Sequence, residues 1–192
     1  MDSLQPWYGA CFSLDGVYDY LKTLTSEDET KEKCNHELFV TWSFAKFLQA
    51  RNKIDYLVGF PLKNIVGAHS ISNIISRSLS VDEDFDTVIV EVEKPERPIR
   101  FQIKRYINNK DASTSDFVHY LITKTRKYGN DNKLNLIFDI QSALKLDLKT
   151  IQHSIINEKF LVGNIFVYFR RGVLSNIMEI HPKYTGIIFS PE

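Results

Sequence analysis

Two different periodicities of apolar residues divide the first half of the chain into predicted elements. Apolar residues recur at helical spacing over residues 32–50, which predicts a largely buried helix. Strict alternation over residues 88–92 predicts a strand, and an extended pattern resumes over 99–107 after a stretch that contains two prolines. Since proline cannot sit within a central ladder, the two extended stretches predict a β-hairpin.

The second half of the chain alternates between predicted helices and strands. Ser115 is a plausible N-cap, Gly129 a plausible C-terminal stop, and Asp147 a second N-cap. The predicted elements are a helix over 116–128, a strand over 134–140, a helix after Asp147, a strand over 164–169, and one or two edge strands within 177–188. This order predicts an α/β (α+β) fold, in which helices flank a mixed sheet.

Residues 1–30 differ from the rest of the chain, and we interpret them as an N-terminal appendage. Their apolar positions space like a short amphipathic helix, and a polar stretch, 25–33, follows. No linker or repeat interrupts the remainder, so residues 31–192 are predicted to form one domain. Within it, residues 56–80 mix helix-like and strand-like patterns and give no clear element.

Composition narrows the class of protein. With 192 residues, of which 43% are hydrophobic, the chain can bury a full core, and intrinsic disorder is excluded. Lys and Arg number 24 and Asp and Glu 24, so a generally basic nucleic-acid or membrane-surface binder is disfavoured. Two cysteines without CxxC spacing indicate a reducing, cytoplasmic setting, and no apolar run is long enough to span a bilayer, which predicts no membrane association.

Several common site motifs are absent. The chain has no phosphate-binding loop, no dinucleotide-binding glycine turn, no nucleophile elbow and no HExxH zinc motif. The acidic run 82–86 lacks the glycine and the final glutamate of an EF-hand loop. Any chemistry must therefore come from a different arrangement of residues.

Charge is neutral only on average. All charged residues within 82–93 are acidic, whereas Lys and Arg dominate 94–127. An acidic strand beside a basic one suits a site that holds a divalent cation and attracts a polyanion. Cross-strand charge pairing on a solvated sheet face is the alternative.

The hairpin places three polar groups within reach of one another. Asp86 begins the first strand, while Gln102 and Lys104 project from the same face of the second. Asp86 supplies a hard oxygen ligand, and the Gln102 amide oxygen or the Ile103 carbonyl can supply another. A lysine fixed on the strand can orient water or stabilise charge on a phosphate. This set fits phosphodiester hydrolysis.

These residues also carry a family resemblance. The stretches Phe85–Val90 (FDTVIV) and Phe101–Tyr106 (FQIKRY) resemble the PD-(D/E)xK nuclease superfamily in its QxK variant. They are most similar to Mrr-type restriction endonucleases and to nuclease effector domains of antiphage systems. The resemblance covers about residues 32–140. It implies a restriction-endonuclease-like αβββαβ core, in which a helix, an antiparallel three-stranded meander, a second helix and a further strand follow one another, with flanking helices.

The resemblance also implies an activity and roles for residues. Asp86 corresponds to the metal-binding acid, Gln102 to the second motif position and Lys104 to the motif lysine, although no proline precedes Asp86. Many relatives carry a glutamate on the first helix, and Glu37 is the candidate. The implied activity is that of a Mg²⁺- or Mn²⁺-dependent DNA endonuclease in restriction or antiphage defence, with metal ligands from Asp86, Gln102, Ile103 and Glu37.

The helical arc supports an inward position for Glu37. At about 100° per residue, Glu37 falls within the apolar face of the predicted helix 32–50. A lone buried carboxylate is costly, so we expect a metal ion or a hydrogen-bonding partner beside it. The alternative is a glutamate near a helix N-terminus, where the helix dipole favours it.

Basic side chains around the hairpin are candidate phosphate contacts. Compensation of the helix dipole explains those near the end of helix 116–128 equally well. The candidates for nucleic-acid binding are Arg100, Arg105, Lys110, Lys124 and Lys127. Since no large recognition domain is visible, a homodimer or a partner subunit would supply recognition of DNA.

Two alternative functions remain beside the nuclease. Gln102 is neutral, so one ligand charge is missing, and the same fold could serve as a catalytically weakened module for nucleic-acid binding or complex assembly. The other alternative is a structural interaction protein in which the motif is coincidental.

Overall fold

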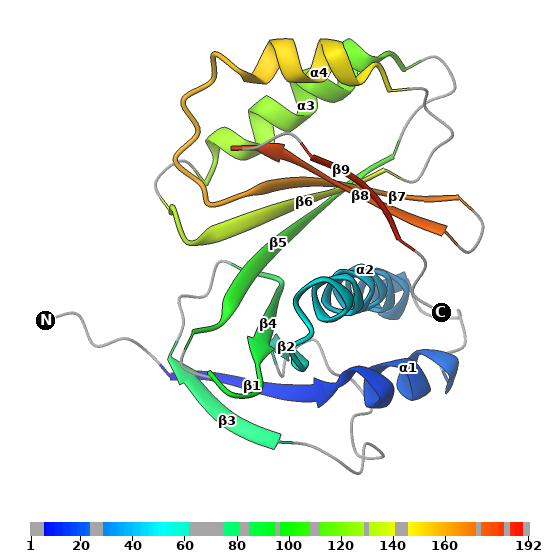
Figure 1. Ribbon diagram of the computed structural model, residues 1–192, viewed down its shortest axis with the longest axis vertical. Coiled ribbons are helices and arrows are strands. Elements are labelled where there is room, and N and C mark those ends of the chain that lie inside the picture. Colours follow the sequence, from blue (N-terminus) through cyan, green and yellow to red (C-terminus); the bar gives the residue numbers. More distant parts are fainter. Residues whose placement is uncertain are drawn as a thin grey trace, which may run out of the picture. The chain divides into compact units, whose positions relative to one another are not determined.

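The protein was analysed as a computed structural model, which describes residues 6–23, 29–61, 75–80, 85–94, 97–107, 112–128, 131–140, 146–171, 174–182 and 185–189. The described residues form nine strands and four helices, which confirms the predicted mixed α/β class (Figure 1). The chain divides into two compact units, Met1–Phe101 and Gln102–Glu192. Strand β5 (Ile99–Tyr106) contributes its first three residues to the first unit and the others to the second.

The first unit is built on antiparallel strands in the order β3-β1-β2-β4-β5. β1 lies between β2 and β3, with Gly9 opposite both Pro61 and Arg77. β2 then pairs with β4 and β4 with β5, so these three antiparallel strands lie side by side, although β3 comes between β2 and β4 in the sequence. The elements that complete this unit are β1 (Pro6–Ser13), α1 (Leu14–Thr23), α2 (Glu29–Asn52), β2 (Tyr56–Pro61), β3 (Ile75–Ser80) and β4 (Thr87–Glu91).

Helix α2 supplies much of the core of the first unit, as its helical repeat predicted. It packs against β2 and β4, and the ring of Phe44 contacts that of Phe101 with centroids 5.1 Å apart. Trp42 is also buried, and its indole N–H donates to the Leu14 carbonyl at 2.8 Å, which ties α1 to α2. The unclear stretch 56–80 contains β2 and β3, while residues 62–74 lie outside the described part.

Residues 6–23 supply β1 and α1. Cys11, Phe12, Leu14 and Val17 are buried. Since Cys11 and Phe12 are neighbours on β1, they point to opposite faces of the strand, and both faces are covered at this end of β1. The boundary between an appendage 1–30 and a domain 31–192 stays a prediction.

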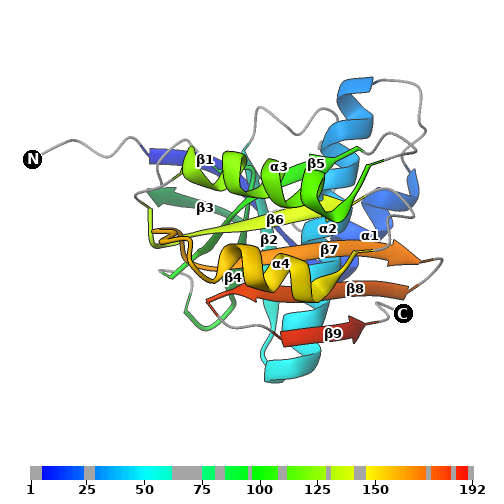
Figure 2. The same cartoon turned by 90° about the horizontal axis from the view of Figure 1, so that it is seen from above.

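The second unit has helices over one face of a mixed sheet. Its strands follow the order β5-β6-β7-β8-β9; β6 and β7 are parallel, and β7, β8 and β9 are antiparallel. A parallel pair needs a crossover, and α4 provides it. Figures 1 and 2 show α3 and α4 side by side over β6, β7 and β8. The elements are α3 (Thr114–Arg126), β6 (Leu134–Ile140), α4 (Leu148–Ile155), β7 (Ile165–Arg171), β8 (Leu174–His181) and β9 (Thr185–Phe189).

The caps of the two helices were predicted with unequal success. Asp147 caps α4 as expected, and its carboxylate accepts from the backbone N–H of Lys149 at 3.0 Å. The predicted cap of α3, Ser115, is wrong: Ser113 is the N-cap, and Asp116 completes a capping box with it. Ser113 is the cap because Asp116, three residues later, accepts a hydrogen bond from the Ser113 backbone N–H. Gly129, the predicted stop, lies outside the described residues.

The C-terminal strands match their prediction in part. β8 and β9 overlap the expected stretch 177–188, but β8 begins before it and β9 ends one residue beyond it. β9 lies at the end of the strand order, whereas β8 pairs on both sides and is not the edge strand that was predicted.

Candidate active site

The hairpin of β4 and β5 positions Asp86. Thr87 lies opposite Phe101 and Ile89 opposite Ile99. Just before β4, the backbone N–H of Asp86 donates to the Phe101 carbonyl at 2.9 Å. Asp86 is half-buried. The candidate acid is therefore held by its backbone to the residue that precedes Gln102 in the chain.

Helix α2 brings Glu37 into the same part of the first unit. Glu37 is 9% exposed, which agrees with the predicted inward face. One turn later, the Thr41 hydroxyl donates to the Glu37 carbonyl at 2.8 Å and lies 2.9 Å from the Thr87 hydroxyl. Since a hydroxyl has one hydrogen, which Thr41 gives to Glu37, we assign Thr87 as the donor to Thr41. These two hydrogen bonds link the helical turn from Glu37 to Thr41 with Thr87, the residue that follows Asp86.

Gln102, Ile103 and Lys104 lie on β5 in the second unit. Gln102 and Ile103 are buried, at 7% and 5% exposure, whereas Lys104 is half-buried. The Lys104 ammonium lies 5.2 Å from the centroid of the Tyr128 ring, within the range of a cation–π contact. Gln102 and Lys104 are thus two residues apart on one strand, as predicted, and differ in their access to solvent.

Helix α3 is attached to β5 beside Lys104. The Tyr120 hydroxyl donates to the Arg105 carbonyl at 2.9 Å, and the Tyr106 ring contacts those of Phe117 and Tyr120 at 5.2 and 5.1 Å. Burial raises the pKa of Tyr120, and neighbouring Tyr128 and Tyr106 raise it further. The phenol consequently stays protonated at neutral pH and keeps donating to β5.

The predicted phosphate contacts have different surroundings. Arg100 and Arg105 are half-buried, and Lys127 is exposed at the end of α3. Lys124 is half-buried, with its ammonium 5.3 Å from the Tyr120 ring centroid. Lys110 lies outside the described residues. The four described residues are accessible in part, and their roles in nucleic-acid binding stay predictions.

Several polar residues that the fold buries or pairs gave little or no signal in the sequence. Thr41 and Thr87 are fully buried, and the polar role of neither showed in the pattern. Asp139 is 2% exposed on β6; a lone acid in the apolar run Leu134–Ile140 was the signal that could have marked it. The pairing of Tyr128 with Lys104 gave no signal, because the two residues are distant in sequence.

The oxygen donors predicted as metal ligands fit magnesium by their chemistry. Mg²⁺ takes oxygen ligands and commonly uses one or two carboxylates together with water. Glu37 and Asp86 would supply carboxylates, Gln102 an amide oxygen and Ile103 a carbonyl. Within the described ranges, no group of three or more His, Cys, Asp and Glu side chains is placed to hold a metal ion.

Comparisons with family models, curated proteins and solved structures found no match for this chain. Among the helices that the structure describes, none is both long and apolar enough to cross a membrane.

Proposed function

We propose that this protein is a metal-dependent endonuclease that hydrolyses phosphodiester bonds of DNA, with Asp86, Gln102, Lys104 and Glu37 as its site residues. The observation that carries the proposal is the hydrogen bond from the Asp86 N–H to the Phe101 carbonyl. It attaches the candidate acid to the strand on which the QxK residues follow directly.

The order of elements also supports this function. Helix α2, the antiparallel strands β2, β4 and β5, helix α3 and strand β6 occur along the chain in the order that the PD-(D/E)xK resemblance implies. β3 interrupts this order in sequence, but it pairs with β1 on the far side of β2 from β4. The restriction-endonuclease-like core is therefore part of the proposal.

Each site residue has a role in this reaction. A water oxygen bonds to phosphorus while the bond from phosphorus to the leaving sugar oxygen breaks. The water gives up one proton to solvent, and solvent returns a proton to the leaving oxygen, which becomes a hydroxyl. The second water proton stays on the new phosphate or ionises to solvent. The Lys104 ammonium would offset the charge that develops on the phosphate oxygens. A bound divalent cation supplies Lewis-acid stabilisation of the same charge, and the oxygens of Asp86, Glu37, Gln102 and Ile103 would hold it.

Basic residues would supply contacts to the DNA backbone. Arg100, Arg105, Lys124 and Lys127 would bind phosphates without reading sequence, so they would give salt-dependent affinity. A homodimer or a partner subunit would add recognition, in a cytoplasmic role in restriction or antiphage defence.

The second candidate function is a catalytically weakened module for nucleic-acid binding or complex assembly. The neutral amide of Gln102 favours it, because Gln102 is buried on β5 and brings no charge to a metal site. Such a module would bind DNA with steep salt dependence and leave it intact.

Plasmid nicking in Mg²⁺ or Mn²⁺ tests the two functions. We expect divalent-dependent cleavage that Asp86→Ala and Lys104→Ala each reduce by about 100-fold or more, because each removes a group that stabilises the transition state. The exposed residues Asp15 and Lys133 provide matched controls, and Asp15→Ala and Lys133→Ala should cleave like the unaltered protein. Cleavage that persists undiminished in Asp86→Ala would falsify the assignment. DNA binding without any cleavage would favour the binding module.

A further inference from the structure

The basic residues of the described chain differ in what contacts their charge. The guanidinium of Arg126 is bound by both carboxylate oxygens of Glu158, at 3.0 and 3.1 Å, and Lys46 lies 3.6 Å from Asp15. Lys104 forms no ion pair with any residue that the structure describes, and its ammonium contacts the face of Tyr128. Lys104 is therefore held by a partner that carries no formal charge.

A ring and a carboxylate have different consequences for a lysine. A carboxylate would neutralise the ammonium and occupy its donors, whereas a ring face attracts the cation through its quadrupole. The ammonium has three N–H donors, and a contact on one side leaves donors for a phosphate oxygen. Such a lysine is oriented, and no carboxylate competes with a phosphate for its N–H donors.

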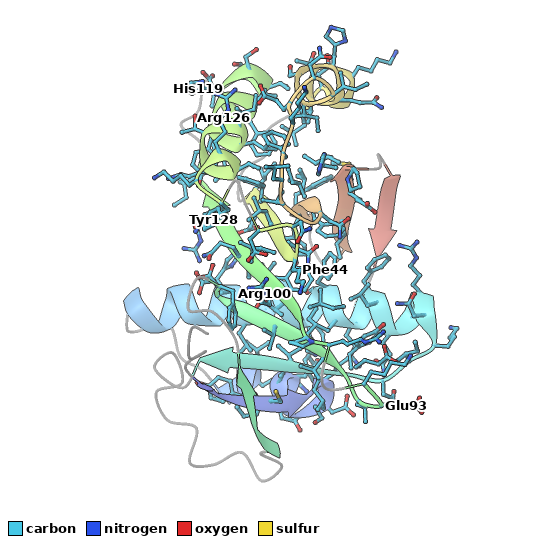
Figure 3. All side chains as sticks on the ribbon, turned by 90° about the vertical axis from the view of Figure 1, so that its left-hand side faces the viewer. Phe44, Glu93, Arg100, His119, Arg126 and Tyr128 are labelled. Carbon is cyan, nitrogen blue, oxygen red and sulfur yellow. The ribbon has the colours of Figure 1, made fainter. Side chains whose placement is uncertain are left out.

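The position of Tyr128 is set by the same packing that positions β5. The Tyr128 N–H donates to the Thr125 carbonyl at 3.0 Å, and its own carbonyl accepts from the Asp131 N–H at 3.2 Å. Figure 3 shows His119, Arg126 and Tyr128 in this order along α3 and the turn that follows it. Since α3 is fastened to β5 through Tyr120 and the Arg105 carbonyl, the ring is held beside the strand that carries Lys104.

We propose that Tyr128 is a positioning residue, whose ring face holds the Lys104 ammonium ready for a phosphodiester oxygen. This inference rests on the proposed nuclease function and adds a residue outside the PD-(D/E)xK motif to its site. Tyr128 acts through Lys104 and needs no contact with the substrate. The aromatic face carries the effect, so the phenol hydroxyl is dispensable.

A second lysine–tyrosine pair on α3 offers an internal comparison. Lys124 lies over Tyr120 at a similar distance, 5.3 Å, but the Tyr120 ring also packs on Tyr106 and Phe138. Tyr120 therefore supports the fold, and its replacement would disturb α3. Tyr128 has no such ring contacts among the described residues, so it can be altered more cleanly.

Nuclear magnetic resonance tests the contact independently of activity. In protein labelled with ¹³C-lysine, the ring current of Tyr128 should shift the signal of the Lys104 ε-methylene protons. This signal is assigned as the one that disappears in Lys104→Arg. Tyr128→Leu should return this signal to the position of solvent-exposed lysines, Tyr128→Phe should keep it shifted, and the Lys124 signal should stay unchanged in both. A Lys104 signal that Tyr128→Leu does not move would overturn the proposal.

Kinetics then test the role in catalysis. We expect Tyr128→Leu to lower kcat by about 3- to 10-fold with little change in KM, because the lysine meets charge that develops in the transition state. Tyr128→Phe should restore kcat, and Lys133→Ala should match the unaltered protein. Far-UV circular dichroism checks that the variants are folded.

The outcomes separate this proposal from the function on which it rests. If the unaltered protein cleaves DNA, Asp86→Ala does not, and Tyr128→Leu has an unchanged kcat, the positioning role is wrong and the nuclease function stands. An equal loss in Tyr128→Phe and Tyr128→Leu would also overturn the role of the ring. If the unaltered protein shows no cleavage, the nuclease function fails and the catalytic role of Tyr128 fails with it.

Discussion

The two regions that carry the candidate site are built in opposite ways. The acid region, Glu37, Thr41, Asp86 and Thr87, lies in the first unit, where buried hydroxyls form hydrogen bonds with each other and with the backbone. The lysine region, Lys104 with Tyr128, lies in the second unit and is half-buried. Buried hydrogen bonds stabilise the fold because an unmatched donor there is costly, whereas a half-exposed cation contributes little to stability and keeps its access to ligands.

Breaking the hydroxyl pair of the acid region should give the largest change in stability. Thr41→Val removes the acceptor of the Thr87 hydroxyl at a fully buried position, and we expect a loss of about 1–3 kcal/mol in the free energy of unfolding. Thr87→Val should cost less, about 1 kcal/mol, because Thr41 still donates to the Glu37 carbonyl. Urea unfolding followed by tryptophan fluorescence measures this, since Trp7 and Trp42 both belong to the first unit.

The double variant sharpens this test. Thr41→Val with Thr87→Val removes donor and acceptor together, so it should be more stable than Thr41→Val alone. Strictly additive losses would show that the two hydroxyls do not interact and that the assigned donor is wrong.

Removing the cap of α3 should have the next largest effect, and it falls on the helix that precedes Tyr128 in the second unit. The Ser113 hydroxyl accepts from the Asp116 N–H at 3.3 Å, so Ser113→Ala should destabilise the start of α3 by about 1 kcal/mol. Ser115 is exposed and matched in size, and Ser115→Ala should change the stability by less than about 0.5 kcal/mol. Hydrogen exchange of the α3 amides compares the two. A larger effect of Ser115→Ala would contradict the observed capping box.

Lowering the pH should remove a smaller contribution to stability, the one that the Asp116 carboxylate makes at the start of α3. The Ser113 N–H and hydroxyl both donate to the Asp116 carboxylate at 2.7 Å and lower its pKa below the usual 3.8. A lowered folded-state pKa stabilises the fold above the unfolded value, and this contribution disappears as pH falls through the folded value. Asp116→Asn should therefore have a lower Tm than the unaltered protein near pH 6, with a gap that closes as pH falls below 3.8. A gap that stays constant over this range would argue against the carboxylate's role in the capping box.

The smallest change in stability is expected at the lysine region itself. Lys104→Met should alter the free energy of unfolding by less than about 1 kcal/mol, because partly exposed cation–π contacts contribute no more than this. Tyr128→Phe should alter it less still, since the ring face that contacts Lys104 remains. Far-UV circular dichroism in urea measures it. A loss as large as that of Thr41→Val would place Lys104 among the residues that hold the fold together.

Much of the fold followed from local patterns. Alternation over 88–92 predicted β4, helical spacing predicted α2, and Asp147 marked the start of α4, because periodicity and capping act within a few residues. The wrong cap at Ser115 shows the limit of this approach: two serines lie two positions apart, and Asp116 decides between them by the bonds it forms with Ser113.

The features of the candidate site also divide into those that local sequence patterns predicted and those that only the tertiary structure decided. The sequence alone placed Asp86 at the start of a strand, Gln102 and Lys104 two residues apart on the next, and Glu37 on the inner face of a helix. The tertiary structure decided the rest: the Thr41–Thr87 hydrogen bond, the burial of Asp139 and the ring that faces Lys104. The physical reason is range, since periodicity records what each residue does relative to its neighbours in the chain, whereas these contacts join residues that only packing brings together.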